Sequence, residues 1–160
     1  MNAELAHHLF SYADGFLYWK NPSNPKKTPV GSVAGTVSAR GYVHVQYKRK
    51  IYKAHRLIFL MFNGYVSDII DHIDGNILNN RPENLRAATH AGNARNARKR
   101  VDNSSGVKNV CWHKRLNKWG VSLSIDGKQR HFGYFEDLEL ATLMASEARD
   151  KYHGTFARAQ

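Results

Sequence analysis

Cysteine is almost absent from the sequence, with Cys111 alone among 160 residues. This excludes an intramolecular disulfide and a zinc site built from several cysteines. No long apolar run is present either: LIFLMF at 57–62 is far short of the roughly 20 residues that span a bilayer. The opening MNAELAHHLF lacks the basic start and apolar stretch of a signal peptide. We therefore expect a cytosolic protein without membrane contact, and a Cys111 buried as a small apolar residue in a strand.

Acidic residues are scarce. The chain has 13 Asp and Glu against 24 Lys and Arg, a formal net charge of +11, which favours a polyanionic partner, nucleic acid before an anionic membrane. The charge is uneven, because residues 92–130 hold ten Lys and Arg and only two Asp, a net of +8 over 39 residues. The hydrophobic content of 42% is that of a globular protein.

The segment ARKRVDNSSG at 97–106 has the composition of a linker, with a basic run followed by Asp, Asn, two serines and a glycine. It predicts a boundary near Asn103, and hence two domains at 1–102 and 103–160. In the first domain, alternation of apolar and polar residues predicts strands at 16–20 and within 41–54. AHRLIFLMFNG predicts a short buried helix that stops at Gly64, and Thr89 is a suitable N-cap for a helix through about Arg98.

The second domain has a simpler pattern. Residues 106–116, 118–126 and 128–135 predict three strands, the last two joined by a tight turn at Asp126-Gly127. Alternating apolar residues in the middle strand face one side, and a helix over 137–152 has apolar residues at the spacing needed to cover them. The sequence thus predicts an α+β protein whose C-terminal part is a three-stranded antiparallel sheet packed on one helix.

The segment at 71–93, DHIDGNILNNRPENLRAATHAGN, contains five asparagines, an Asp-His pair and an Asp-Gly turn. Asparagine favours caps and turns over helix and strand interiors, so the segment predicts a tightly folded loop or a polar site. With a strand at 69–73, a turn at Asp74-Gly75, a return strand that reaches Asn84 and a helix that begins at Thr89, Asn93 is carried back over the hairpin. The unit is two strands and a helix around a polar centre.

Such a centre suits phosphodiester cleavage. The Asp71 carboxylate and the Asn93 amide oxygen are ligands that a hard divalent cation prefers. His72 points to the opposite side of its strand from Asp71 and can take the proton of an attacking water. Asn84 is expected to hydrogen-bond across the loop and fix the histidine.

Other residues of the segment have competing interpretations. His90 lies three residues before Asn93 on the same helix face and is an alternative third ligand. A set of four residues is better explained by turn formation than by metal binding; these are Asp74, Asn76, Asn79 and Asn80. His55, at the start of an apolar helix, is expected to be a packed or capping residue.

DHIDGNILNNRPENLRAATHAGNARN, with the preceding AHRLIFLMF, resembles the His-Asn-His (HNH) motif of intron-type and phage homing endonucleases over about residues 40–98. The resemblance implies a ββα-metal (His-Me finger) core at about 68–98. By resemblance His72 is the general base, Asn84 the middle asparagine, and Asp71 with Asn93 the ligands of one cation. Asn93 stands where the motif has its final histidine, and the loss of an imidazole favours Mg²⁺ or Mn²⁺ over Zn²⁺ or Ni²⁺.

Residues 104–160 resemble the APETALA/ethylene-response-factor (AP2/ERF) type of DNA-binding domain, on Trp112, Trp119, the HFGYF at 131–135 and the alanine-rich helix. In that family the sheet enters the major groove, which admits a two-stranded ribbon. We expect both tryptophans to serve in packing first. The expected DNA contacts, in the linker and on or beside the strands, are Arg95, Arg98, Lys99, Arg100, Lys114, Arg115, Lys118 and Arg130.

Together these features predict a phage or mobile-element DNA endonuclease that acts on double-stranded DNA. A single metal centre per chain favours a monomer that nicks one strand. A non-catalytic DNA-binding regulator that retains the nuclease fold is the alternative, and a ribonuclease or RNA-binding protein ranks last because the major groove of RNA is too narrow for readout by a sheet.

Overall fold

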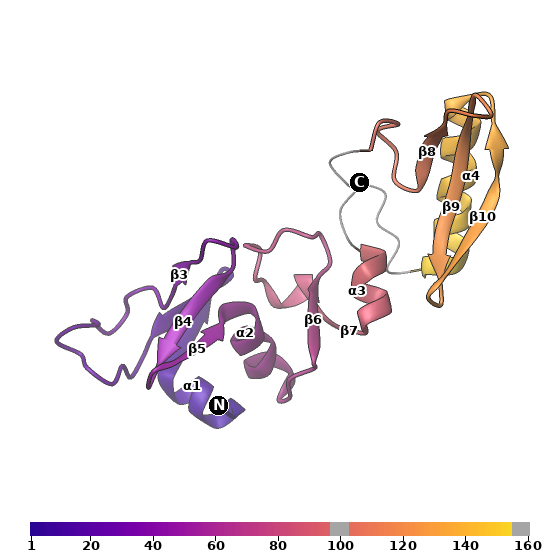
Figure 1. Ribbon diagram of the computed structural model, residues 1–160. Coiled ribbons are helices and arrows are strands. Elements are labelled where there is room, and N and C mark those ends of the chain that lie inside the picture. Colours follow the sequence, from indigo (N-terminus) through magenta and orange to yellow (C-terminus); the bar gives the residue numbers. More distant parts are fainter. Residues whose placement is uncertain (97–102, 155–160) are drawn as a thin grey trace. The chain divides into compact units, whose positions relative to one another are not determined.

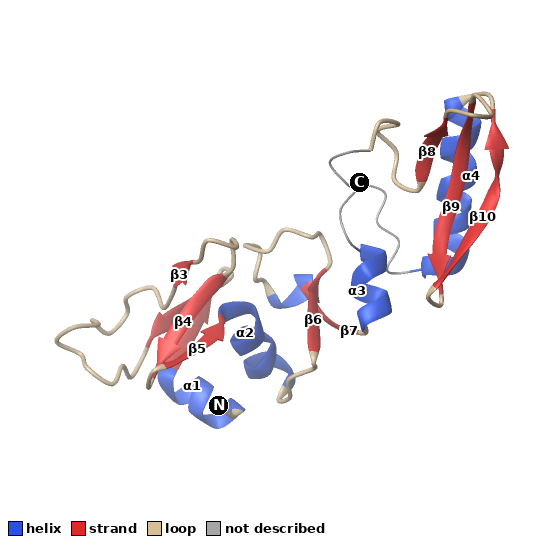
Figure 2. Cartoon of the chain, viewed as in Figure 1, coloured by secondary structure: helices blue, strands red, loops and turns tan. Residues whose placement is uncertain are grey.

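The computed structural model describes residues 1–96 and 103–154 and is a mixed α+β protein, as predicted (Figures 1 and 2). The chain divides into two compact units, Met1–Ala88 and Thr89–Gln160, and each is described by itself. The predicted boundary near Asn103 adjoins residues 97–102, which lie outside the described residues, and it stays a prediction. Within the described residues, no helix is both long and apolar enough to cross a membrane.

The first unit begins with a short helix and a hairpin. Helix α1 (Ala3–Leu9) is capped by Asn2, whose side-chain oxygen accepts from the backbone N–H of Leu5 at 3.0 Å. Strands β1 (Phe10–Ala13) and β2 (Phe16–Trp19) pair antiparallel through a turn at 14–15. The second of these strands is the one predicted at 16–20.

A three-stranded antiparallel sheet follows, in the order β3-β4-β5. Its strands are β3 (Thr36–Val37), β4 (Val43–Tyr47) and β5 (Lys50–Lys53). The last two form a hairpin in the stretch where strands were predicted. Because side chains alternate along a strand, Val45 enters the core and is fully buried, whereas its neighbour Gln46 is exposed.

Helix α2 (Ala54–Asn63) starts directly after β5 and ends at Gly64, as predicted. Gly64 has a φ of 75°, a left-handed conformation that glycine adopts without a steric penalty. The buried face of α2 packs with α1, β1, β2 and β4 in one hydrophobic core, whose largest fully buried members are Phe10, Leu17, Leu57, Ile58 and Val45.

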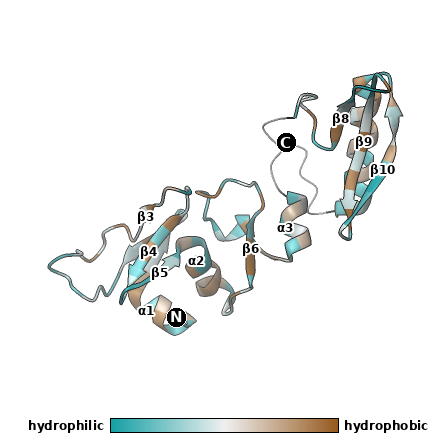
Figure 3. Ribbon diagram, viewed as in Figure 1, coloured by the Kyte–Doolittle hydropathy of each residue, from teal (hydrophilic) through white to brown (hydrophobic). Residues whose placement is uncertain are grey.

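The polar segment forms a second hairpin in the same unit. Strand β6 (Ile69–His72) pairs antiparallel with β7 (Leu85–Ala88), and the intervening loop ends in a single 3₁₀ turn, η1 (Pro82–Asn84). Figure 3 shows the change along β6 from its apolar first half to the polar Asp71 and His72. Ile70 and Leu85 join the core, so this hairpin is anchored on α2.

The second unit contains a helix, a three-stranded antiparallel sheet in the order β10-β9-β8, and a long final helix. Side chains of β8, β9 and α4 share a hydrophobic core, with Val110, Val121, Leu123, Ala141, Ala145 and Ala148 buried. Its elements are α3 (His90–Asn96), β8 (Val110–His113), β9 (Lys118–Ile125), β10 (Lys128–Phe135) and α4 (Leu138–His153).

The prediction for Cys111 was wrong, because its thiol is exposed. Val110 occupies the core-facing position of β8, and the alternation of side chains along the strand turns Cys111 to the other face. The two tryptophans pack against each other edge to face, with ring centroids 4.8 Å apart, in agreement with a packing role.

Candidate active site

Helix α2 and the loop after it position strand β6. Both terminal nitrogens of Arg56 donate to backbone carbonyls just before the strand, Nη1 to Asp68 and Nη2 to Ser67, each at 2.9 Å. These two bonds hold the start of β6 to the helix. The polar end of the strand is therefore held at a fixed place beside the core.

Asp71 is 6% exposed, and a buried carboxylate needs a compensating charge. Arg86 supplies it from the directly paired position on β7. Its Nε and Nη2 both donate to Asp71 Oδ2, at 3.0 and 2.9 Å, and the two side chains are 17% and 7% exposed. The proposed metal ligand is thus half of a largely buried ion pair.

His72 is 5% exposed and faces away from Arg86, as expected for the next residue along a strand. Its Nε2 lies 3.0 Å from Oδ1 of Asn80, which is also buried. An amide oxygen only accepts, so with this side-chain orientation Nε2 carries the proton and the lone pair of the neutral ring is on Nδ1. The nitrogen suited to act as a base is therefore Nδ1.

A second buried imidazole lies against the first. His55 is 5% exposed, and its ring centroid is 5.0 Å from that of His72 in an edge-to-face arrangement. Burial, reinforced by the charges of His72, Lys53, Arg56 and His44, lowers the pKa of His55 to about 3. It is a packed residue, as predicted, and stays neutral beside His72 at physiological pH.

Asn84 organises the loop between β6 and β7. Its Nδ2 donates to Asp74 Oδ1 at 2.9 Å and to the Asn79 carbonyl at 2.8 Å, and its Oδ1 accepts from the Asp74 N–H at 3.0 Å. Its own carbonyl accepts from Ile73 N–H at 2.9 Å. Asn84 thus bonds across the loop as expected, but to Asp74 and Asn79, whereas the imidazole of His72 bonds to Asn80.

Asp74 is the centre of the turn. Burial raises the pKa of its carboxyl, but hydrogen bonds from the Asn79 side chain, the Asn76 backbone and the Asn84 side chain outweigh this and hold the pKa below its ordinary value. The Asn76 N–H bond is 2.7 Å and the Asn79 Nδ2 bond is also 2.7 Å. Asp74, Asn76 and Asn79 are therefore turn formers, as predicted.

Two residues of this site were missed by the sequence analysis. Asn80 was assigned to turn formation, and Arg86 was not singled out at all. The alternation of β7 offered a signal for Arg86, because a lone cation between apolar neighbours in LRAA indicates a buried partner of opposite charge. No comparable signal separates Asn80 from Asn79.

The remaining predicted ligand, Asn93, lies on α3 in the second unit, and both it and His90 are exposed. The helix begins as predicted: the Gly92 N–H donates to Thr89 Oγ1 at 3.0 Å. Its predicted end at Arg98 lies outside the described residues. Asp71, His72 and Asn84 share the first unit, whereas Asn93 is the fourth residue of α3 in the second unit.

A hard divalent cation suits the oxygen donors available here. Among residues 1–96 and 103–154, no group of three or more His, Cys, Asp and Glu side chains is placed to hold a metal. A site with few protein ligands, completed by water and phosphate oxygens, is the ordinary arrangement for Mg²⁺. In the first unit the Asp71 carboxylate is an oxygen donor of this kind, and it is already paired with the positive charge of Arg86.

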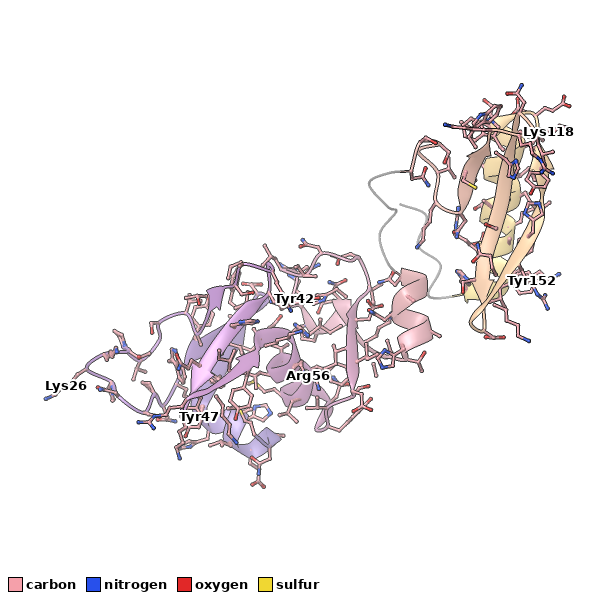
Figure 4. The ribbon with its side chains drawn as sticks, in the orientation of Figure 1. Lys26, Tyr42, Tyr47, Arg56, Lys118 and Tyr152 are labelled. Atoms are coloured by element: carbon pink, nitrogen blue, oxygen red, sulfur yellow. The ribbon has the colours of Figure 1, made fainter. Side chains whose placement is uncertain are left out.

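The expected DNA contacts in the second unit are surface residues. Lys114 and Arg115 are exposed in the turn between β8 and β9, and Lys118 forms an ion pair with Glu136 at 3.2 Å. Arg130 pairs with the core residue Leu123, which puts it on the helix side of the sheet, and its guanidinium carbon lies 5.8 Å from the ring of Tyr152, a residue labelled in Figure 4. Arg98, Lys99, Arg100 and the side chain of Arg95 lie outside the described residues.

The face of the sheet that α4 does not cover carries rings as well as charge. His113 and His131 flank Tyr134, with ring centroids 5.2 and 4.3 Å from it. Lys118 pairs with His113 on the same face. None of these three rings was among the predicted DNA contacts, although His131 and Tyr134 belong to the HFGYF stretch.

Comparison with known proteins places these observations in a family. A family model described as HNH endonuclease matches residues 52–95, a range that includes α2, β6, the loop, β7 and Asn93. A relative, Protein 3.8 of Escherichia phage T7, is 35% identical over 115 residues, which are 69% of this chain and 94% of that protein. No solved structure matches the chain.

Proposed function

The chain belongs to the same family as the phage Protein 3.8 and carries an HNH endonuclease domain, and from that premise we propose that it is a metal-dependent, homing-type DNA endonuclease. The substrate is double-stranded DNA, and the reaction is hydrolysis of a phosphodiester bond. For a monomer with one centre, the expected product is a nick. The observation that carries the proposal is the buried His72, oriented by Asn80 next to the Asp71 carboxylate within the matched range.

In this proposal His72 is the general base. Its Nε2 is hydrogen-bonded to Asn80, so the proton of the attacking water goes to Nδ1. Proton transfer to a positioned side chain contributes about 10²–10⁴-fold to a rate. Asn80 holds the ring in one tautomer and orientation, and Asn84 maintains the loop that carries Asn80.

Asp71 and Asn93 would hold one divalent cation, Mg²⁺ or Mn²⁺. Bound there, the cation would stabilise charge on the phosphate and on the leaving oxygen. Arg86 holds the Asp71 carboxylate in place by two hydrogen bonds to a single oxygen. In this proposal the chain itself contributes the Asp71 carboxylate, held in position, the His72 imidazole, oriented as the base, and Arg86, close to the place where a phosphate binds.

We also propose that the second unit is an AP2/ERF-like module that selects where the nuclease acts. Contacts to the phosphate backbone carry no sequence information, so selectivity needs another surface. The three-stranded sheet with one covering helix supports it, as do the exposed cations at its turn. The proposed contacts remain Arg95, Arg98, Lys99, Arg100, Lys114, Arg115, Lys118 and Arg130.

A plasmid assay tests the nuclease. Supercoiled plasmid with Mg²⁺ or Mn²⁺ is expected to be nicked by the wild type, while His72→Ala loses about 10²–10⁴-fold in rate. His8→Ala, at an exposed position on α1, is the matched control and is expected to cut normally. If wild type and His72→Ala are equally inert with both metals, the regulator is the better assignment.

A further inference from the structure

The first unit carries a second basic surface, separate from the linker and the C-terminal sheet. Residues 15–67 contain nine Lys and Arg and no Asp or Glu, over 53 positions. Four of the nine lie on or beside the β4–β5 hairpin: Lys48, Arg49, Lys50 and Lys53. Within the described residues, no carboxylate forms an ion pair with any of these four.

The tip of this hairpin is unusual in its backbone. Tyr47 pairs with Lys50, so the loop has two residues, Lys48 and Arg49, with φ of 47° and 63°. This is the geometry of a type I′ turn, for which Asn-Gly is preferred because side chains are disfavoured at positive φ. The hairpin instead places two long cations there, at an energetic cost of order 1 kcal/mol or more. A turn that lowers stability but exposes two cations indicates that Lys48 and Arg49 are there to bind a ligand.

One face of the hairpin points away from the core, and its end opposite the tip contacts the active-site histidines. Alternation of side chains places Val43, Val45 and Tyr52 on the core face and a mostly polar set, together with the exposed Ile51, on the other, which we call the outer face. The outer face consists of Tyr42, His44, Gln46, Ile51 and Lys53.

The outer face reaches His72 in short steps. Lys53 Nζ lies 4.4 Å from the centre of the Tyr42 ring, and the Tyr42 ring lies 5.5 Å from that of His55. His55 in turn contacts His72. Tyr42 and Tyr47 stand at opposite ends of β4 (Figure 4). Lys53, Tyr42, His55 and His72 therefore form a continuous series of contacts at one end of the hairpin. The exposed cations Lys48 and Arg49 lie at its other end, all within the first unit.

We propose that the β4–β5 hairpin binds the phosphate backbone of duplex DNA and sets the direction in which the duplex leaves the active site. The inference rests on the proposed function for the location of the cut, but not for binding itself. Five strand residues span about 17 Å, which is about half a helical turn of B-DNA. Lys48 and Arg49 therefore contact phosphates about half a turn beyond those near Lys53.

The test compares two charge-matched double variants of the full chain. Lys48→Gln/Arg49→Gln removes two cations at the hairpin tip, and Lys26→Gln/Lys27→Gln removes two exposed neighbouring cations from the loop between β2 and β3 (Figure 4). Binding to a 30-base-pair duplex is followed by fluorescence anisotropy without divalent metal, between 50 and 200 mM salt. Loss of two phosphate contacts lowers the slope of log K against log salt by about 1.8 and weakens binding roughly 10- to 100-fold at 0.1 M salt. The loop variant is expected to keep the slope of the wild type.

A third variant separates binding from folding. Lys48→Asn/Arg49→Gly gives the turn its preferred residues, so its thermal midpoint is expected to rise while its DNA affinity falls as in the Gln pair. Hydroxyl-radical footprints of the wild type should show protection about half a turn from the cut that both hairpin variants lack.

Specific outcomes overturn the proposal. Equal slopes for the hairpin and loop variants would mean that only bulk charge matters. Equal displacement of the DNA by an RNA duplex would remove the assignment to DNA. If the wild type binds DNA through the hairpin but does not cut it, the hairpin site stands and the nuclease proposal is wrong. If the wild type cuts DNA and the hairpin variants bind it as tightly as the wild type, the nuclease proposal stands and the hairpin site is wrong.

Discussion

Asp71, His72 and Asn84 in the first unit are at most 8% exposed and are held by side-chain hydrogen bonds. In the second unit, the proposed DNA contacts Lys114 and Arg115 are exposed in a turn, whereas its buried Arg149 and His153 bond to backbone carbonyls and belong to no proposed site. Polar groups that are buried with partners have one fixed geometry, which chemistry requires. Exposed cations keep their freedom, which suffices for contacts to a backbone of uniform charge. The difference agrees with the roles proposed for them, chemistry for the first set of residues and DNA binding for the second.

The largest expected consequence of this difference concerns Arg86. Arg86→Ala leaves the buried Asp71 carboxylate without its cation, and removal of one partner of a buried pair destabilises by about 3–5 kcal/mol. Hydrogen exchange at the amides of β6 and β7 measures the free energy of opening. Arg115→Ala, in the exposed turn, is the control and should change stability by no more than about 0.5 kcal/mol. Similar values for the two variants would remove the distinction between the units.

Within the first unit, Asn84 and Asn80 are expected to differ in how much they contribute to stability and to activity. Asn84→Ala deletes three side-chain hydrogen bonds of the loop and is expected to destabilise by about 2–3 kcal/mol. It also removes a bond that lowers the pKa of Asp74, so that pKa should rise. Carboxyl chemical shifts across an acid titration measure this directly.

In contrast to Asn84→Ala, Asn80→Ala is expected to affect activity more than stability. It removes one bond, to His72, so its effect on unfolding should be smaller than that of Asn84→Ala. Its effect on kcat should be larger, about 10–100-fold, because the ring of the base loses its orientation. The plasmid assay at saturating DNA gives kcat. If Asn84→Ala lowers kcat more than Asn80→Ala while both fold, Asn80 does not position the base.

The sequence predicted regular elements well and side-chain partnerships poorly. The end of α2 at Gly64, the Thr89 cap and the strands on either side of Asp126-Gly127 follow from local rules on capping, turns and alternation. The partners of His72 and Asp71 depend on which of several similar residues the folded loop brings near. In NILNNRPEN, nothing local distinguishes the asparagine that meets the imidazole from those that shape the turn. The burial of Cys111 was wrongly predicted because the register of the strand decides which face of the sheet each side chain occupies.

Acid should weaken the first unit through His55. Its pKa is about 3 in the folded protein and near 6.5 in an unfolded chain, so between these values the unfolded state binds the additional proton. Stability therefore falls as the pH drops below 6.5, by about 2 kcal/mol at pH 5. Urea unfolding at pH 7 and pH 5 measures the loss.

A variant isolates this contribution. His55→Phe keeps an aromatic ring and cannot be protonated, so its stability should change about 2 kcal/mol less between pH 7 and pH 5 than that of the wild type. The window lies above the range in which Asp74, with its lowered pKa, contributes. An identical pH dependence in both proteins would show that His55 is not held neutral by burial.

The smallest expected effects are in the second unit, where they separate binding from stability. Lys114→Ala, in the exposed turn, should leave the free energy of unfolding within about 0.5 kcal/mol and reduce the salt slope of DNA binding by about 1. Lys151→Ala, also exposed but on α4, carries the same charge on the helix and should leave the slope unchanged. Because the two variants have equal net charge, a difference between them is due to position alone. Equal slopes would mean that the sheet end of this unit has no special contact with the backbone, and selectivity would then have to come from the first unit and its hairpin.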